Sequence, residues 1–386
     1  MKICILTPRF PFPENGGDVL RINSIARYLK TQKHELVLCS FVTNKHTDSE
    51  KKAANELYNK IYTIRYSKIN SFIHMVFSFI SNKPIQCGYY SSGKFSKKFR
   101  KIIKDEKCDL FISHLLRMTP YLEKNKLEKQ SIVEMTDALS KTYELSQKNK
   151  GFSIKKIIYI IERKRIKKYE QHVIKKFKKV VLVSRTDIDY LGDYSNLSLH
   201  TNGINCFDNN SITNAKKICF VGNMRTLQNQ DAVIHFVTNI FPIISAKYPD
   251  IQFHIVGAEP PVSIENLADN KRIFVTGFVE SVENYILDSN LIIAPVNIAA
   301  GIQNKVLIGM ACKIPVVLSS LIAKSIPELK SGENCYIADD HFEFAEVCMN
   351  LISDKELRDR IAKKGFEMVK EHYSWHDKLM NYEIIR

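Results

Sequence analysis

Two stretches of the chain decide the fold, Lys2–Pro8 (KICILTP) and Lys217–Asn223 (KICFVGN). Each is an almost continuous apolar run that ends in a turn and is followed by helical spacing. Apolar strands that alternate with helices are typical of parallel sheets covered on both faces. Because this opening occurs twice in 386 residues, the sequence predicts an α/β protein with two Rossmann-like, doubly wound domains in tandem.

Further apolar runs predict the other strands. In the first half we expect strands at His34–Phe41, Ile61–Arg65, Asp109–Ser113, Ser131–Met135 and Lys179–Ser184. In the second half we expect them at Lys217–Gly222, Ile251–Val256, Arg272–Val275, Leu291–Pro295 and Pro315–Leu318. A long basic helix is expected at Ile154–Lys176. Apolar residues at three-four spacing from Val233 to Ile244 predict another helix, with Asn229 or Asp231 as its cap.

The stretch Asn202–Ala215 is polar and lies between predicted elements, so we expect a linker there. It divides the chain into domains at residues 1–205 and 206–370. Open parallel sheets bind their ligands at the carboxyl ends of the strands. Two such domains facing each other therefore predict an active site in the cleft between them.

The composition is that of a soluble globular protein, with 45% hydrophobic and 25% charged residues. No signal-like segment follows Met1, and no apolar run approaches the ~20 residues of a membrane-spanning helix. The nine cysteines include no Cys-x-x-Cys pair, and no His, Cys, Asp and Glu residues have the spacing of a metal site. We expect a cytoplasmic protein that needs neither a metal ion nor a resident cofactor.

The formal net charge of +16 is unevenly distributed. Thirteen Lys or Arg residues lie in 148–179 against two acidic residues, and a second basic cluster spans Lys94–Lys101. Basic surfaces bind the phosphates of lipids, nucleic acids or substrates, although a solvated helix face explains the pattern equally well. Nucleic acid ranks lower because no nucleic-acid-binding module is recognisable. For a membrane surface, the aromatic residues at the interface would be Phe95, Phe99 and Tyr159.

The strongest local signal for ligand binding is Ala300–Ala311 (AGIQNKVLIGMA), which follows an apolar strand and opens a helix. Gly301 allows the backbone to turn closely, and the first turn of a helix has N–H groups without intrahelical partners. Such a helix start attracts a diphosphate, to which Lys305 adds a positive charge. A plain strand-to-helix turn is the alternative explanation.

In the first half, Gly16 and Gly17 stand between the opening strand and a helix. Paired glycines there offer bare N–H groups to an anion, or simply form a tight turn. Arg21, one helical turn later, could project toward the same place. The three residues share the sheet edge at which a ligand is expected.

Three further polar residues follow predicted strands in the first half: His114, Arg117 and Asp137. A single histidine is more often packed or exposed than functional, but the carboxyl end of a parallel strand raises the odds for His114. Arg117 could equally be the relevant contact. Asp137 is either a substrate contact or the N-cap of the next helix.

A set of motifs extends over most of the chain. GIQNKVL at 301–307 is followed by MA at 310–311 and PVV at 315–317. FVGNM at 220–224 is followed by NQDAV at 229–233, and an Asn-Gly turn occurs in TNGI at 201–204. Together they resemble the family-four retaining glycosyltransferases of the GT-B fold, particularly bacterial exopolysaccharide, lipopolysaccharide and capsule sugar transferases. In that family YSW at 373–375 would begin a final helix, here 371–386, that crosses back to the first domain.

The resemblance implies a peripheral enzyme at the inner face of the membrane that transfers a hexose with retention. The donor would be a UDP- or GDP-sugar and the acceptor a glycan or lipid-linked oligosaccharide. The family's motifs imply His114, Gly17 and Asp137 as catalytic residues. The implied donor-binding residues are Gly16, Gly222, Arg225, Gly277, Gly301, Ile302, Gln303, Asn304, Lys305 and Ile308. The protein would supply position and charge stabilisation rather than a nucleophile.

The sequence departs from the family at two positions. Members usually have a Glu at the position of Ile308, which binds the donor ribose, and often another at the position of Ala300. Neither residue present here has a side-chain hydrogen-bond acceptor. Two alternatives therefore stay open: a non-catalytic descendant that binds a glycan or partner, and a nucleotide-sugar 2-epimerase, which has the same tandem fold.

Overall fold

The computed structural model describes residues 1–14, 16–43, 46–66, 74–75, 78, 84–148, 154–207, 216–269, 271–297, 304–380 and 382. The chain forms two compact units. The first comprises Met1–Asn202 together with the segment that begins at Lys378, and the second comprises Gly203–Asp377. Each unit is built on one parallel sheet, as the two apolar openings predict.

The first unit contains a seven-stranded sheet in the order β3-β2-β1-β4-β5-β6-β7. All neighbouring strands are parallel. The apolar openings form the centre of the sheet because buried strands on both faces need a continuous apolar run. The strands are β1 Lys2–Thr7, β2 Glu35–Val42, β3 Lys60–Arg65, β4 Leu110–His114, β5 Ser131–Thr136, β6 Lys179–Leu182 and β7 Leu197–Leu199.

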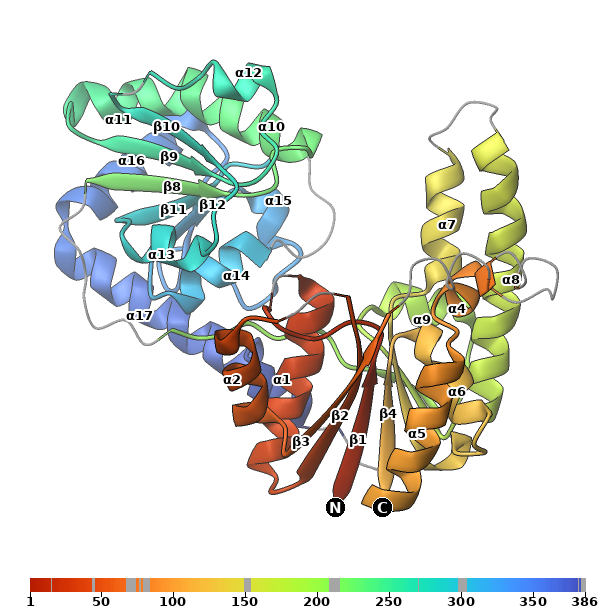
Figure 1. Ribbon diagram of the computed structural model, residues 1–386. Helices are drawn as coiled ribbons and strands as arrows, with labels where there is room; N and C mark the ends of the chain where they lie inside the picture. Colours follow the sequence, from red (N-terminus) through yellow and green to blue (C-terminus); the bar gives the residue numbers. More distant parts are fainter. Residues whose placement is uncertain are drawn as a thin grey trace. The chain divides into compact units, whose positions relative to one another are not determined.

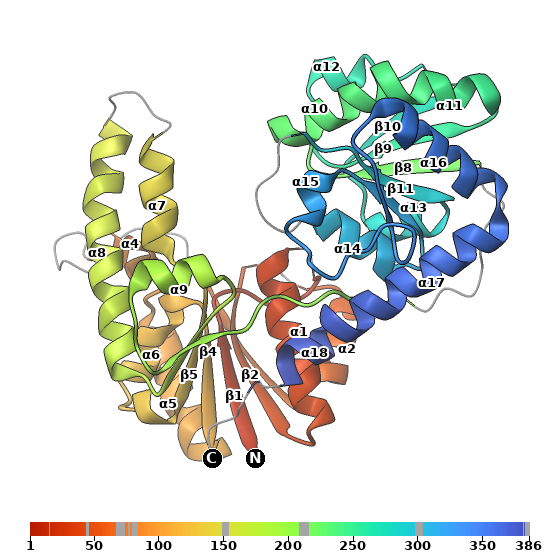
Figure 2. The ribbon, with the colours of Figure 1, turned by 180° about the vertical axis from the view of Figure 1, so that it is seen from behind.

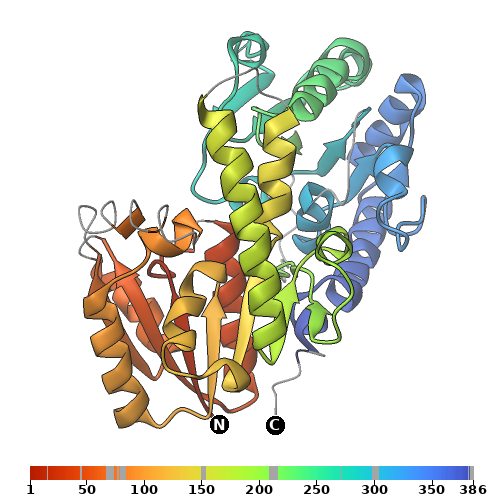
Figure 3. The ribbon, with the colours of Figure 1, turned by 90° about the vertical axis from the view of Figure 1, so that its right-hand side faces the viewer.

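Helices cover both faces of this sheet. Figure 1 shows α1 and α2 on one face and α5, α6 and α8 on the other. The last two long helices, α7 and α8, lie side by side (Figure 3). The helices are α1 Gly17–Thr31, α2 Asp48–Leu57, α4 Ile85–Tyr89, α5 Gly93–Glu106, α6 Thr119–Glu123, α7 Leu139–Lys148, α8 Ile154–Lys176 and α9 Arg185–Leu191, with 3-10 turns η1 Leu116–Met118 and η2 Glu128–Gln130.

The second unit contains a six-stranded parallel sheet in the order β10-β9-β8-β11-β12-β13. Its strands are β8 Lys217–Val221, β9 Gln252–Val256, β10 Ile273–Gly277, β11 Leu291–Ala294, β12 Val316–Leu318 and β13 Tyr336–Ile337. In Figure 1, α10, α11 and α16 cover one face, and α13 and α14 cover the other. The helices are α10 Leu227–His235, α11 Phe241–Lys247, α12 Val262–Glu265, α13 Val282–Leu287, α14 Asn304–Ala311, α15 Ser320–Ala323, α16 His341–Ser353 and α17 Lys355–His372. The last helix, α18 Trp375–Met380, begins in the second unit and ends in the first.

All the predicted strands are confirmed, and the basic helix has the predicted bounds, Ile154–Lys176. The helix predicted around Val233–Ile244 is interrupted by a π-helical turn at Phe236–Ile240. Pro242 stands at the start of α11, where it lacks an N–H for the regular helical ladder. The predicted caps are wrong, because Thr226 occupies the N-cap position of α10.

The prediction that aromatic residues of α5 lie at a membrane interface is also wrong. Phe95 and Phe99 are fully buried in the core of the first unit, so neither can enter a membrane. They point inward because the apolar face of the helix packs on the sheet, while its basic side chains face solvent. The side chain of Tyr159 lies outside the described residues.

A buried polar network ties the end of the chain to the first unit. The Arg21 guanidinium donates from Nε to Glu134 Oε2 at 2.8 Å, and the Tyr382 hydroxyl donates to Glu134 Oε1 at 2.8 Å. Just before Tyr382, α18 lies beside α1 (Figure 2), where the Tyr28 hydroxyl donates to the Met380 carbonyl. The expectation that Arg21 projects to the glycine loop is therefore wrong, because burial of its charge requires the carboxylate partner.

Candidate active site

Each sheet has one place where the strand order reverses. In the first sheet β1 lies between β2 and β4, and in the second β8 lies between β9 and β11. Ligands of open α/β sheets bind at the carboxyl ends of the strands beside such a reversal. The loops that follow β1, β4, β8 and β11 carry most of the predicted site residues, so each unit is considered in turn.

The glycine loop begins the helix after β1. Gly16 is the N-cap of α1 and has a φ of 128°, a conformation that side chains rarely allow. A Cβ atom on Gly16 would lie 3.1 Å from Arg9 Nη2. A Cβ on Gly17 would meet nothing within 4 Å. The backbone conformation before α1 thus requires a glycine at position 16, and there is open space beside Gly17.

His114 ends β4 beside this loop. Its side chain is 1% exposed, and neither ring nitrogen has a hydrogen-bond partner among the described residues. Burial lowers the pKa of His114 to about 3; Asp18 opposes this shift, whereas nearby arginines including Arg117 reinforce it. The imidazole is therefore neutral at physiological pH and offers one donor and one acceptor. It cannot serve there as a cationic group.

The backbone is strained where β4 and β5 end. Leu115 has a φ of 68° and Thr136 has a φ of 71°, positions that are rare for residues with a side chain and especially for a β-branched one. The hydroxyl groups of Thr136 and of Thr7, at the end of β1, are buried without a hydrogen-bond partner among the described residues. Strain and unused polar groups therefore gather at the ends of three adjacent strands.

Asp137 follows Thr136 and lies at the surface. Partial desolvation raises the pKa of its carboxyl group, and the nearby Asp187 carboxylate adds to the effect. The alternative role as a helix cap is taken by Asp187, which accepts a hydrogen bond from the Ala138 N–H at 3.3 Å and pairs with Lys141 at 2.7 Å. Asp137 is left accessible at the strand end.

In the second unit, two glycines allow the backbones after β8 and β9 to approach closely. A Cβ atom on Gly257 would lie 1.7 Å from the Gly222 carbonyl oxygen. A Cβ on Gly222 would lie 2.6 Å from Asn229 Nδ2. Gly277, at the end of β10, has a φ of 66° and open space around it. The loops after β8 and β9 are therefore tightly packed, with the Gly222 N–H donating to the Val256 carbonyl at 3.0 Å, whereas the end of β10 is open.

Arg225 extends from the loop after β8. Its side chain is 75% exposed and forms an ion pair with Glu259, which follows β9 and has a φ of 57°. The Arg225 N–H donates to Asn223 Oδ1 at 2.9 Å. An ion pair so exposed contributes little to stability. The guanidinium can therefore exchange Glu259 for another anion at small cost.

Lys305 lies in the first turn of α14 and is 8% exposed. Its ammonium group donates to Asn229 Oδ1 at 2.5 Å and lies 4.5 Å from the centre of the Phe220 ring. Burial lowers its pKa to about 8. Asn229 in turn donates from Nδ2 to the Asn223 carbonyl at 2.8 Å. Lys305 thus contacts the loop after β8 through an amide, without a carboxylate.

The remaining predicted residues of this region are only partly described. Asn304 is exposed at the start of α14, and Ile308 is half-buried one turn later. Gly301, Ile302 and Gln303 lie outside the described residues, as does Ala300. The described geometry of the predicted donor site therefore rests on the loops after β8, β9 and β10 and on α14.

Part of the second unit is similar to a known family. Residues 215–354 match the glycosyl transferases group 1 model. A protein of *Klebsiella pneumoniae* described as an uncharacterized 44.6 kDa protein in the cps region is 23% identical over 383 residues, covering 96% of both chains. The match to group 1 glycosyltransferases covers Gly222, Arg225, Gly277 and Lys305.

Solved structures share the fold of the whole chain. The *Anabaena* Alr3699/HepE structure in complex with UDP-glucose has a TM-score of 0.60 at 12% identity, covering 98% of this chain and 97% of that one. The *S. aureus* TarM mutant complex with UDP has a TM-score of 0.58 at 14% identity, covering 99% and 98%. WaaG, a glycosyltransferase involved in lipopolysaccharide biosynthesis, has a TM-score of 0.57 at 13% identity, covering 99% of both chains. The fold is GT-B, two parallel α/β domains.

Within the group 1 match, sequence reasoning missed the role of Asn229. The sequence indicates a helix cap there, whereas its side chain links Lys305 to the Asn223 carbonyl. The available signal was Gly222, which leaves room for the amide. Sequence reasoning also missed the buried hydroxyls of Thr7 and Thr136, which no local pattern distinguishes from ordinary strand residues.

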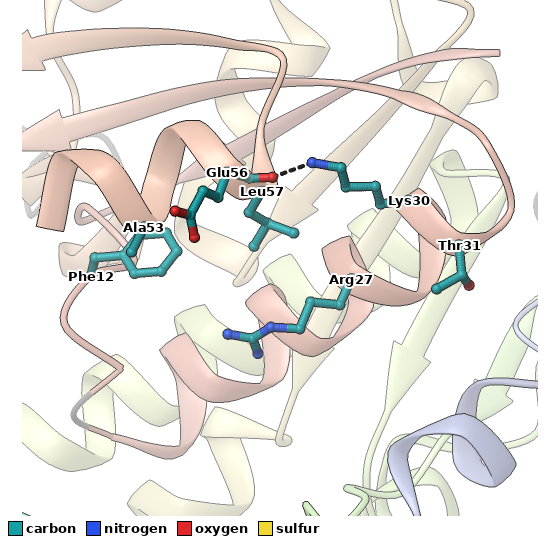
Figure 4. Close-up of a pocket in the computed structure, with 7 residues that line it drawn as sticks. All are labelled: Phe12, Arg27, Lys30, Thr31, Ala53, Glu56 and Leu57. Atoms are coloured by element: carbon teal, nitrogen blue, oxygen red, sulfur yellow. Dashed lines mark hydrogen bonds between the residues drawn. The ribbon is translucent and has the colours of Figure 1, made fainter. Parts of the chain in front are cut away.

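Two pockets of the first unit lie away from these residues. One, of about 500 Å³, is lined by the side chains shown in Figure 4, where Lys30 reaches the Glu56 carbonyl. Another, of about 740 Å³, is lined mainly by cationic residues of α5. Within the described ranges, no three His, Cys, Asp or Glu side chains are arranged to hold a metal ion. None of the described helices is long and apolar enough to cross a membrane.

Proposed function

We propose that the protein transfers a sugar from a nucleoside-diphosphate donor to a glycan, and that the second unit holds the donor. One observation carries the proposal: Lys305 is buried at the carboxyl edge and faces an amide instead of a carboxylate. A buried ammonium group loses its hydration and normally has an acidic partner. Since Asn229 offers only a neutral oxygen, the charge of Lys305 remains available to an anionic ligand.

The surrounding loop provides further groups for a diphosphate. Gly277 leaves open space at the end of β10, and the Arg225 guanidinium is held by an exposed ion pair with Glu259. A guanidinium suits phosphate oxygens. The match to the group 1 glycosyltransferases covers these residues and supports the same ligand.

In the proposed reaction, the bond between the anomeric carbon and a diphosphate oxygen breaks, and the acceptor oxygen forms the new bond. The acceptor hydroxyl gives its proton to the departing diphosphate. Negative charge grows on the diphosphate, where Lys305 and Arg225 would stabilise it. We propose retention at the anomeric carbon, with both oxygens on one face of the sugar, and a hexose as the transferred group.

The similar proteins support the substrate class. HepE is solved with UDP-glucose, WaaG is involved in lipopolysaccharide biosynthesis, and the *Klebsiella* relative lies in a cps region. We therefore propose a UDP-sugar as the first donor to test and a lipid-linked precursor of a surface polysaccharide as the acceptor. His114, Gly17 and Asp137 are the proposed contacts in the first unit.

A membrane-associated acceptor would bring the protein to an anionic surface. Six cationic side chains of α5 form no ion pair with any described residue. They are Lys94, Lys97, Lys98, Arg100, Lys101 and Lys104. Because the aromatic residues of α5 are buried, we propose electrostatic contact without insertion. Sedimentation with vesicles of anionic lipid should lose binding as salt is raised, and binding to neutral vesicles would contradict the proposal.

One observation favours a second function, binding without catalysis. Ile308 has no side-chain acceptor for the donor ribose, although it lies one helical turn from Lys305. A protein that has lost this contact would hold a nucleotide weakly or hold a glycan alone. Turnover therefore has to be measured as well as binding.

Calorimetric titration with UDP, GDP and ADP is the first test. We expect one nucleoside diphosphate to bind selectively, and its sugar conjugate to be hydrolysed slowly when no acceptor is present. Failure of all three nucleotides to bind would overturn the proposal. Selective binding without hydrolysis or transfer to any acceptor would favour the non-catalytic alternative.

A further inference from the structure

A group of aromatic side chains lies at the carboxyl edge of the first sheet. Tyr66 follows β3, and Tyr89 and Tyr90 end α4. The centre of the Tyr90 ring is 5.2 Å from that of Tyr89 and 5.8 Å from that of Tyr66. All three side chains are half-buried, so their rings are partly accessible. Accessible aromatic rings pack well against the apolar faces of sugar rings.

Arg117 adds a positive charge to this patch. It lies in η1, directly after β4, with its guanidinium carbon 5.2 Å from the centre of the Tyr90 ring. Arg117 forms no ion pair with a described residue, and its Nε has no hydrogen-bond partner among them. The neighbouring arginines differ, because Arg9 pairs with Asp18 and Arg21 pairs with Glu134.

The difference between these arginines is chemically informative. A guanidinium that stacks on an aromatic ring keeps its in-plane N–H groups free for a carboxylate or phosphate. Arg9 and Arg21 already bind a carboxylate of the protein itself. Arg117 is thus the cation of this edge whose charge no described acidic side chain neutralises.

Groups suited to hydroxyls lie at the ends of the neighbouring strands. The ring nitrogens of His114, at the end of β4, and the hydroxyls of Thr7 and Thr136, at the ends of β1 and β5, have no hydrogen-bond partner among the described residues. The imidazole is neutral, so it can donate one hydrogen bond and accept another. Directly or through bridging water, these groups match a polyhydroxylated ligand.

We propose that this edge binds a saccharide bearing an anionic group, with Arg117 as the residue that recognises the anion. Tyr90 and Tyr89 pack against the sugar ring, and His114 and the threonines serve its hydroxyls. The anion is a carboxylate, as in a uronic acid, or a phosphate ester. The inference rests on the proposed function and deepens it, because it names the acceptor as an acidic saccharide.

The test compares three probes on the full-length protein by calorimetric titration and saturation-transfer NMR. They are methyl glucuronide, glucose 6-phosphate and methyl glucoside. We expect at least one anionic probe to bind about tenfold more tightly than the neutral one, as one charge-assisted hydrogen bond provides. The better of the two anionic probes identifies the source of the charge.

Arg117→Gln should abolish that preference and leave weak binding of the neutral probe, while Arg117→Lys should keep part of it. Arg185→Gln is the matched control, since Arg185 is an exposed arginine of the same unit that pairs with Asp189. Thermal unfolding and nucleotide binding of each variant serve as folding controls.

Two results would overturn the inference. One is equal or undetectable binding of charged and neutral probes by the wild-type protein. The other is a loss of nucleotide-sugar affinity in Arg117→Gln with saccharide binding unchanged, which would assign Arg117 to the donor. Failure of the nucleotide titrations alone would instead refute the proposed donor site and leave the anion preference as a separate result.

Discussion

Two buried lysines of the second unit differ in one respect. Lys217 begins β8, is 7% exposed, and lies 5.1 Å from the Tyr285 ring centre and 3.5 Å from the Asp288 carboxylate. Lys305 is 8% exposed and lies 4.5 Å from the ring of Phe220, near the other end of β8. Both lie close to an aromatic ring, but among the described residues Lys217 has an acidic partner and Lys305 has none. The comparison indicates that the amino edge is neutralised within the protein, whereas the carboxyl edge is prepared for an anion.

Replacing each lysine by methionine should separate the two edges most strongly. Lys305→Met should weaken binding of the nucleoside diphosphate about 30-fold, because one charge-assisted contact is lost. Lys217→Met should leave that affinity unchanged, although it also removes a buried cation from the second unit. Calorimetric titration of both variants measures the difference. Equal losses in the two would mean that Lys305 acts only through stability.

Supplying Lys305 with an acidic partner should make it resemble Lys217. Asn229→Asp places a carboxylate beside the ammonium group and should weaken diphosphate binding about tenfold. Asn229→Ala keeps the charge uncompensated and loosens the loop only through the lost contact to Asn223, so its effect should be smaller. The order of the two dissociation constants is the readout. A weaker-binding alanine variant would show that Asn229 matters for loop shape rather than for charge.

The pH dependence should also distinguish the lysines. The pKa of Lys305 is lowered to about 8, so above that pH the free protein holds a neutral amine and an anion must bind with uptake of a proton. Diphosphate affinity should therefore fall by up to about tenfold per pH unit above 8. The same shift makes the folded protein bind fewer protons than the unfolded chain, so the free energy of unfolding should rise from pH 8 toward 10.5.

Titrations in buffers of different ionisation enthalpy would measure this proton uptake, and urea unfolding across the same pH range would measure the stability. Lys305→Met should remove both trends, whereas Lys217→Met should keep them. An affinity that stays constant between pH 7 and 9 in the wild-type protein would contradict the proposed role of the Lys305 charge.

The smallest effect on diphosphate affinity is expected at Arg225, which is an exposed cation with an acidic partner, unlike the buried Lys305. Glu259→Gln should strengthen diphosphate binding about twofold at low salt by freeing the guanidinium, because exposed ion pairs are weak. The gain should vanish at high salt. Titration at two salt concentrations provides the test, and a loss of affinity would mean that Glu259 positions Arg225 instead of competing for it.

The fold was predictable because long apolar runs leave few alternatives to buried parallel strands. The strands β7 and β13 escaped prediction because neither is a buried apolar run: β7 is half-buried or exposed, and β13 consists of two half-buried residues. The candidate site was less accessible to sequence reasoning. Lys305 donates to Asn229, which is 76 positions away in the chain, and Arg21 pairs with Glu134, which is 113 positions away. Local spacing cannot reveal such partners.

The hydrogen bond from Tyr382 to Glu134 has a consequence for synthesis. A ribosome releases Met1–Asn202 and then the whole second unit before residue 382 emerges, so the buried pair of Arg21 and Glu134 spends that interval without its last donor. A chain that stops before Lys378 would expose the face of α1 that the tail covers.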